Sequence, residues 1–153
     1  MNKDWNFKSG KNICSFRAVG IFIKDGKVLV QKDNNEYALP GGHVKIGETA
    51  EETLIREFVE ETGLHIKCKR VIWVDECLWS YNGKNVHEIA FYFLVDADES
   101  ISFSKFISQK DNCNILLNWI NINEIKNLNI YPEFIKEKIT NISDDIEHFV
   151  SKE

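Results

Sequence analysis

Apolar positions along the chain fall into short runs separated by turn residues, a pattern typical of β-strands. Four runs are predicted to be strands: Phe16–Ile23, Lys27–Gln31, Ile66–Glu76 and Val86–Val95. Asp25-Gly26 separates the first two and Asn82-Gly83 precedes the last, and both dipeptides favour the tight turns of hairpins. The sequence therefore predicts two hairpins, one on each side of a segment with a different period.

That segment, between Thr49 and Gly63, repeats its apolar residues with the period of an α-helix. Thr49 followed three residues later by Glu52 is a capping-box pattern, which places the N-cap at Thr49. Gly63 is in position to adopt the left-handed conformation that commonly ends a helix. The predicted buried face consists of Ala50, Leu54, Ile55 and Phe58, with Val59 at its margin.

The other segments carry weaker patterns. Residues 1–12 are polar and are predicted to be an irregular lead, and residues 97–113 are predicted to be mostly loop. The later predicted elements are a short strand at Leu116–Ile120, a brief helix capped by Asn123, a longer helix from Pro132, and amphipathic helical turns at residues 143–150. Strands interleaved with two principal helices predict an α/β sandwich, in which a mixed sheet is covered on both faces.

Length and composition are those of a one-domain protein, and we expect a single domain over residues 1–153. The net charge is −5 with both signs interspersed, which argues against binding to a nucleic-acid polymer. The chain has no run of about 18 apolar residues and no signal-peptide core, so we expect a soluble, cytoplasmic protein. The cysteines show neither paired nor zinc-ligand spacing and are expected to be reduced thiols: Cys14, Cys68, Cys77 and Cys113.

Three glutamates share one face of the predicted helix. Glu57, Glu60 and Glu61 stand at spacings i, i+3 and i+4, which places their side chains within an arc of about 100°. Like charges at these spacings destabilise a helix by roughly 0.2–0.5 kcal/mol per pair, and the helix dipole disfavours anions near the C-terminus. A divalent cation would offset both effects, so the carboxylates are predicted to bind a metal ion rather than to form a solvated acidic face.

The segment from Gly42 to Leu64 resembles the Nudix box, G-x5-E-x7-R-E-U-x-E-E-x-G-U, where U is a bulky apolar residue. Its fixed positions are filled by Gly42, Glu48, Arg56, Glu57, Phe58, Glu60, Glu61, Gly63 and Leu64. Phe58 is a departure, because the family usually has an aliphatic residue there. The resemblance covers about residues 16–140. It implies a Nudix-type α/β/α sandwich with a mixed sheet, in a MutT-like hydrolase that cleaves diphosphate linkages.

The resemblance also implies a set of metal ligands and a residue that orients them. The implied ligands of Mg²⁺, or of Mn²⁺ as its substitute, are the carboxylates of Glu57, Glu60 and Glu61 and the carbonyl of Gly41. Magnesium prefers oxygen ligands and retains several waters, which suits a few carboxylates better than a closed cage. Arg56 is expected to orient the glutamates, commonly together with Glu48. The alternative is an exposed i, i+4 pair of Arg56 with Glu52 or Glu60.

Outside the box, Glu88 is the best acidic candidate. Many Nudix enzymes use an additional glutamate as a metal ligand or general base, so Glu88 is predicted to be a catalytic residue. The alternative is a solvent-facing strand carboxylate. His87 is expected to be a surface or hydrogen-bonding histidine, and His43, at a variable position of the box, is not expected to bind metal.

The substrate is less sharply indicated than the chemistry. Candidates for stacking on a nucleobase are Trp73, Trp79, Tyr81, Tyr92 and Phe103, although aromatic residues in strands more often belong to the core. The short chain favours a small nucleotide-containing diphosphate, such as a nucleoside triphosphate, a nucleotide sugar or ADP-ribose. The alternatives are a hydrolase of non-nucleotide diphosphates and a ligand-binding regulator, against which the complete set of box glutamates argues. We expect no membrane partner and leave a homodimer open.

Overall fold

Three long strands form the centre of the structure: β2 (Asn12–Lys24), β6 (Ile66–Tyr81) and β7 (Lys84–Ala97). The computed structural model describes residues 3–97, 106–107 and 115–153. β7 lies between the other two long strands, antiparallel to β6 and parallel to β2. The predicted turns at Asp25-Gly26 and Asn82-Gly83 are both present, and all four residues have the positive φ that tight hairpin turns require.

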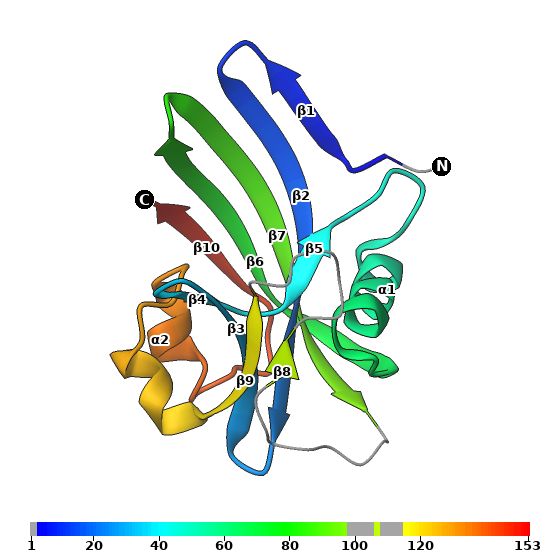
Figure 1. The fold of residues 1–153 in the computed structure, drawn as a ribbon, viewed down its shortest axis with the longest axis vertical. Helices are drawn as coiled ribbons and strands as arrows, with labels where there is room; N and C mark the ends of the chain where they lie inside the picture. Colours follow the sequence, from blue (N-terminus) through cyan, green and yellow to red (C-terminus); the bar gives the residue numbers. More distant parts are fainter. Residues whose placement is uncertain (1–2, 98–105, 108–114) are drawn as a thin grey trace.

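Shorter strands extend this sheet (Figure 1). β10 (Glu147–Lys152) runs parallel to β6, while β1 (Asn6–Ser9) and β5 (Gly41–His43) pair antiparallel with successive parts of β2. The remaining strands are β3 (Lys27–Asp33), β4 (Glu36–Ala38), β8 (Phe106–Ile107) and β9 (Leu116–Asn121). β3 follows β2 through the first hairpin and pairs with β4 and β9, and β9 pairs with β8. Parallel and antiparallel pairings together make the sheet mixed.

Helices lie on both sides of the sheet (Figure 1). The helical elements are α1 (Ala50–Thr62), the 3₁₀-helix η1 (Ile122–Asn127) and α2 (Phe134–Lys138). Leu54 and Phe58 of α1 belong to one hydrophobic core, whereas Ile125 of η1 and Ile135 of α2 belong to a second. Because the strands contribute side chains to both cores, the predicted α/β sandwich with a mixed sheet is confirmed.

The predicted helical turns at residues 143–150 are wrong, because this segment leads into β10. Its side chains alternate between half-buried and exposed, which is the period of a strand. Phe149 stacks on Phe134 with ring centroids 4.1 Å apart and also contacts Trp73, at 6.3 Å. Pairing with β6 and burial of this aromatic ring therefore outweigh a weak helical pattern.

Other boundaries also differ from the predictions. Residues 1–12 are not all irregular, because β1 and the start of β2 pair with each other there. Asn121 rather than Asn123 caps η1, since its side chain accepts a hydrogen bond from the Asn123 N–H at 3.0 Å. The helix after Pro132 has only the five residues of α2. Ile55 is 36% exposed, because it lies at the margin of the buried face of α1.

Some predictions fall on residues that the structure does not describe. Phe103, Cys113 and most of the predicted loop at residues 97–113 lie outside the described residues. Cys14, Cys68 and Cys77 are free thiols. Within the described ranges, no helix is long and apolar enough to cross a membrane.

Candidate active site

The two ends of α1 fix the position of the acidic residues. At its start, the Thr49 side chain accepts a hydrogen bond from the Glu52 N–H and the Glu52 side chain accepts one from the Thr49 N–H, both at 3.1 Å. At its end, Gly63 has φ 76° and its N–H donates to the Val59 carbonyl at 3.0 Å. The predicted capping box and left-handed terminus are both confirmed. These caps hold the helix in register, and thereby the carboxylates on its C-terminal half.

Two glycines bring the backbone of β5 against this helix. A Cβ atom added at Gly42 would lie 2.3 Å from the carboxyl carbon of Glu57, and one at Gly41 would lie 2.2 Å from the Ala18 carbonyl oxygen. Any side chain at these positions would therefore displace Glu57 or separate β5 from β2. The glycines thus let the backbone next to Gly41 approach the acidic face of α1.

The predicted metal ligands line one cavity of about 740 Å³, which we call the acidic cavity. Its lining includes Gly41, Gly42, Glu57, Glu60 and Glu61, together with Arg17, Gln31, His43 and Arg56. Glu57 is 4% exposed and Glu61 is 9% exposed, so both residues lie largely out of bulk water. All four predicted ligands are therefore brought to the wall of a single cavity.

Arg56 bridges three glutamates. Its Nε and Nη2 groups donate to the two carboxylate oxygens of Glu48, at 3.1 and 3.0 Å, in a bidentate arrangement. Its Nη1 group donates to Glu57 at 3.3 Å and to Glu60 at 3.4 Å. These hydrogen bonds hold the pKa of the Glu48 carboxyl below its ordinary value and raise the pKa of Arg56. The i, i+4 contact with Glu60 is present, and it belongs to a network that also includes Glu48 and Glu57.

The donor set suits a hard divalent cation, although the side chains are not closed around one. In the described part of the chain, no group of three or more histidine, cysteine, aspartate or glutamate side chains is arranged to hold a metal ion. Carboxylate oxygens and a backbone carbonyl are the ligands that Mg²⁺ prefers, and an open cavity leaves room for the waters that it retains. The Arg56 contacts take up one oxygen of Glu57 and hold Glu60 nearby, and the cavity beside them is lined by oxygen donors that fit such an ion.

Glu88 lies apart from these ligands. It is 9% exposed, so it is not the solvent-facing carboxylate of the alternative interpretation, and it accepts a hydrogen bond from the Ser15 hydroxyl at 2.8 Å. It lines a second cavity, of about 530 Å³, rather than the acidic cavity. Arg17 and Gln31 line both cavities and connect the two.

The two histidines of interest occupy different environments. His87 is exposed on β7, as expected. His43 lines the acidic cavity, and its pKa lies below the ordinary value, chiefly because of burial and then because of the positive charge of Arg17. Its Nδ1 atom is buried without a hydrogen-bond partner among the described residues. The neutral form of His43 is therefore favoured.

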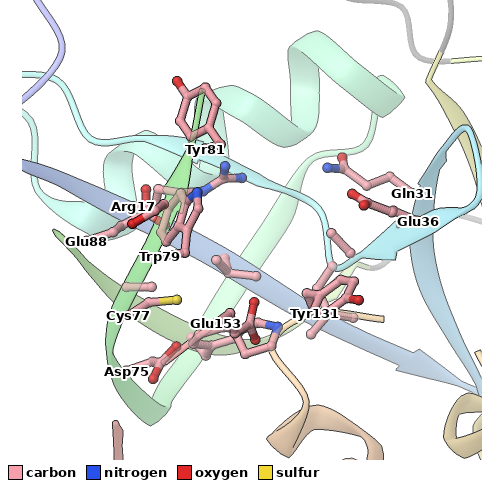
Figure 2. Close-up of a pocket in the computed structure, with 17 residues that line it drawn as sticks. Arg17, Gln31, Glu36, Asp75, Cys77, Trp79, Tyr81, Glu88, Tyr131 and Glu153 are labelled. Carbon is pink, nitrogen blue, oxygen red and sulfur yellow. The ribbon is translucent and has the colours of Figure 1, made fainter. Parts of the chain in front are cut away.

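The second cavity is walled by aromatic rings, and we call it the aromatic cavity (Figure 2). Its aromatic side chains are Trp79, Tyr81, Tyr92 and Tyr131, and its acidic side chains are Glu36, Asp75, Glu88 and Glu153. Of the predicted stacking residues, Trp79, Tyr81 and Tyr92 line this cavity, whereas Trp73 is fully buried against Tyr92 and Phe134. Trp73 therefore belongs to the core.

Several residues of the site were not predicted from the sequence, among them Arg17, Gln31, Asp75 and Tyr131. Arg17 carried a usable signal, because it is a charged residue inside an otherwise apolar strand. Tyr131 and Asp75 carried none, since their approach depends on pairing between distant strands and on the loop before α2.

A sequence profile that describes the NUDIX domain matches residues 15–138. The chain belongs to the Nudix family. The match confirms the resemblance seen in the Nudix box and agrees with its predicted extent. Nudix hydrolases generally use divalent metal ions and act on small nucleotide derivatives.

Curated relatives match only part of the chain. An ADP-ribose pyrophosphatase from Methanocaldococcus jannaschii is 48% identical over 60 residues, which are 36% of this chain and 36% of that protein. A putative mutator protein MutT4 from Mycobacterium tuberculosis is 36% identical over 59 residues, which are 39% of this chain and 24% of that protein. The chain thus spans about a third or less of the length of these relatives.

Solved structures share the fold over most of the chain. A NUDIX hydrolase from Nitrosomonas europaea has a TM-score of 0.63 at 15% identity, covering 91% of this chain and 79% of that chain. A MutT protein from Bacillus halodurans has a TM-score of 0.62 at 20% identity, covering 89% and 90%. At such identities the likeness concerns the fold alone, and it confirms the predicted Nudix-type architecture.

Proposed function

We propose that this protein is a metal-dependent pyrophosphohydrolase that cleaves the diphosphate linkage of a small nucleoside diphosphate derivative. The observation that supports this proposal is the acidic cavity, whose wall carries the carbonyl-bearing Gly41 and the carboxylates of Glu57, Glu60 and Glu61. Candidate substrates are nucleoside triphosphates, nucleotide sugars and ADP-ribose, and the last of these appears in the name of the relative from Methanocaldococcus jannaschii.

The chemistry requires a way to bring water to a phosphorus atom surrounded by negative oxygens. A divalent cation, Mg²⁺ or Mn²⁺, supplies charge neutralisation and lowers the pKa of bound water. The protein would hold it through Glu57, Glu60, Glu61 and the Gly41 carbonyl. Arg56 orients Glu57 and Glu60 through its Nη1 group and is itself fixed by the bidentate contact with Glu48.

Arg17 is suited to bind a substrate phosphate. Its guanidinium is half-buried, lines both cavities and forms no ion pair with any side chain of the described ranges. A half-buried guanidinium that forms no ion pair favours an anionic ligand, and its planar fork matches two phosphate oxygens. A diphosphate that lies in the acidic cavity would extend past Arg17, with its nucleoside in the aromatic cavity.

Glu88 is proposed as the proton acceptor for the attacking water or as an additional metal ligand. Ligation by metal lowers the basicity of the three helix carboxylates, so a base from another element is chemically attractive. Glu88 stands opposite Ser15 on β2, and Arg17 is two residues further along that strand. Either role requires the carboxylate to leave Ser15 and reach towards the acidic cavity.

A hydrolysis screen with Mg²⁺ and with Mn²⁺ tests the proposed function. The panel contains nucleoside triphosphates, nucleotide sugars, ADP-ribose, and prenyl and thiamine diphosphates, and the control is the double variant Glu57→Gln with Glu61→Gln. We expect metal-dependent release of a phosphate product from nucleotide substrates with the wild type and not with the control. Turnover restricted to the prenyl or thiamine compounds, or no turnover at all, would overturn the proposal.

A further inference from the structure

Asp75, at one side of the aromatic cavity, has an oxygen atom to which no described residue donates a hydrogen bond. The residue is completely buried. Its Oδ1 accepts a hydrogen bond from the Ser151 hydroxyl at 2.9 Å, whereas its Oδ2 is buried without a hydrogen-bond partner among the described residues. A buried acceptor without a partner is costly, so such atoms are rare unless a ligand or water satisfies them. The Oδ2 atom therefore requires a hydrogen-bond donor that the described residues do not supply.

The strand geometry directs Asp75 towards the cavity. Asp75, Cys77 and Trp79 alternate along β6, so their side chains lie on the same face of the sheet, and all three line the aromatic cavity. β10 pairs with β6 beside them and supplies Ser151. Figure 2 shows Asp75 and Cys77 on one side of the cavity and Gln31 and Glu36 on the opposite side.

The composition of the cavity limits what it can bind. Its four carboxylates, on Glu36, Asp75, Glu88 and Glu153, face a single guanidinium, that of Arg17. An acidic lining disfavours an anionic group and favours a neutral or cationic group that carries N–H donors. Aromatic walls favour a planar group, because rings stack on one another. A heterocyclic base meets all these conditions, whereas a sugar acid or a further phosphate does not.

We propose that the aromatic cavity binds the base of the substrate and that Asp75 accepts a hydrogen bond from an N–H group of that base through Oδ2, which makes Asp75 a specificity-determining residue. This inference rests on the proposed function, because a diphosphate in the acidic cavity is what directs the base past Arg17.

The ionisation of Asp75 is consistent with an acceptor. Burial raises the pKa of its carboxyl to about 6, and the nearby charges of Glu153 and Glu88 act in the same direction. The hydrogen bond from Ser151 and the charge of His148 oppose this shift. At pH 7 and above the carboxyl is thus mostly ionised and can accept but not donate a hydrogen bond.

The test uses Asp75→Asn, with Ser151→Ala as its matched control. In the asparagine variant, the Ser151 hydroxyl still donates to an oxygen at the Oδ1 position, so the amide NH₂ takes the place of Oδ2. The NH₂ group is a donor and cannot accept a hydrogen bond from the N–H group of the base. The control loses the hydrogen bond to Oδ1 but keeps Oδ2 as an acceptor. The probes are AMP, GMP, CMP and UMP with Mg²⁺. Their binding is measured through the fluorescence of Trp79, which lines the cavity.

We expect Asp75→Asn to weaken binding of the preferred nucleotide by about tenfold or more, and Ser151→Ala to weaken it by less than about threefold. The affinity of the wild type should also fall by about tenfold when the nucleotide is replaced by an analogue whose base lacks the N–H donor. The matched pairs are AMP with purine riboside monophosphate, GMP with IMP, and CMP with zebularine monophosphate. This comparison does not depend on how the variant folds.

Nucleotide affinity that is unchanged in a folded Asp75→Asn variant, or no binding of any of the four nucleotides at millimolar concentration, would overturn the inference. These monophosphates contain no diphosphate linkage, so the measurement is independent of hydrolysis. If the hydrolysis screen finds no turnover while Asp75-dependent binding persists, the proposed function fails and the cavity assignment stands. If the screen finds turnover but nucleotide binding does not depend on Asp75, the proposed function stands and the cavity assignment fails.

Discussion

The acidic cavity and the aromatic cavity meet at Arg17 and Gln31, but they are assembled from the chain in different ways. The acidic cavity takes its glutamates from α1 and its glycines from β5, which precedes that helix directly. The aromatic cavity takes its side chains mainly from β2, β3, β4, β6 and β7, with others from the loop that contains Tyr131 and from Glu153 after β10. Local sequence therefore sets the first, and pairing between distant strands sets the second.

If the proposed function holds, this difference in construction should give the two cavities control over different properties: turnover for the first, and substrate affinity and selectivity for the second. Substitutions in the acidic cavity remove negative charge from the proposed metal ligands and should reduce the rate. Substitutions in the aromatic cavity alter contacts with the rest of the substrate and should change affinity and selectivity. Variants that change both properties together would show that the two cavities do not act separately.

The largest expected effect comes from Glu61→Gln. Glutamine keeps the shape but lacks the charge that holds a cation, so turnover should fall by about two orders of magnitude. The metal-free protein should not lose stability, because one like charge is removed from the acidic face of α1. Turnover with Mg²⁺ and thermal unfolding in EDTA measure the two effects. Glu51→Gln, on the exposed first turn of the same helix, is the control, and wild-type turnover in Glu61→Gln would exclude Glu61 as a ligand.

A smaller loss is expected for Arg56→Lys. Lysine keeps the positive charge but cannot reproduce the two parallel bonds to Glu48, so Glu57 and Glu60 lose their fixed orientation. We expect turnover to fall by about tenfold, with a loss of stability below about 1 kcal/mol because the ion pairs are partly exposed. Arg70→Lys is the control, since Arg70 binds the backbone carbonyls of Ser143 and Asp144. Full turnover in the Arg56→Lys variant would show that Arg56 forms only surface ion pairs and does not orient the glutamates.

Glu88→Gln tests the boundary between the two cavities. As a proton acceptor, Glu88 should matter for the maximal rate and not for KM, so we expect a fall in rate of about tenfold and loss of the acidic limb of the pH–rate profile. If Glu88 is a metal ligand instead, extra Mg²⁺ or Mn²⁺ should restore much of the rate. Ser15→Ala keeps the charge of Glu88 and removes only the hydrogen bond from Ser15, and is the control. An unchanged rate, pH profile and metal dependence would leave Glu88 as an ordinary strand residue.

The contrast between the cavities also explains what could be predicted from the sequence. The capping box at Thr49, the glycine at position 63 and the spacing of the three glutamates all act within a few residues, so the helix and its acidic wall were predictable. The hairpins at Asp25-Gly26 and Asn82-Gly83 were predictable for the same reason.

The rest depends on contacts between segments far apart in the chain. β10 carries only a weak pattern of its own and is held by pairing with β6 and by stacking of Phe149 on Phe134. The sequence marks Glu88 as a candidate catalytic residue. The cavity that it lines depends on the register of β7 on β2, which the sequence does not indicate. In the sequence, Asp75 is only an acidic residue within a predicted strand. Its contact with Ser151 depends on the pairing of β10 with β6, which the sequence does not indicate.

The last predicted effect is on stability rather than on turnover, and it is a change in how the free energy of unfolding depends on pH. The pKa of Asp75 is about 6 in the folded protein against an ordinary value of 3.8, so between these pH values the folded state retains a proton that the unfolded state has lost. The free energy of unfolding should thus decrease as pH rises through this window, and the penalty should be complete above about pH 6.

Asparagine carries no titrating proton in either state. Between about pH 4 and pH 7, Asp75→Asn should therefore gain stability relative to the wild type by roughly 2 kcal/mol, measured by urea unfolding at each pH. Ser151→Ala should act in the opposite direction, because it removes the hydrogen bond that lowers the pKa of Asp75 and so steepens the dependence. Parallel stability curves for the wild type and Asp75→Asn would show that the carboxylate is already satisfied, which would also remove the ground for a ligand donor at Oδ2.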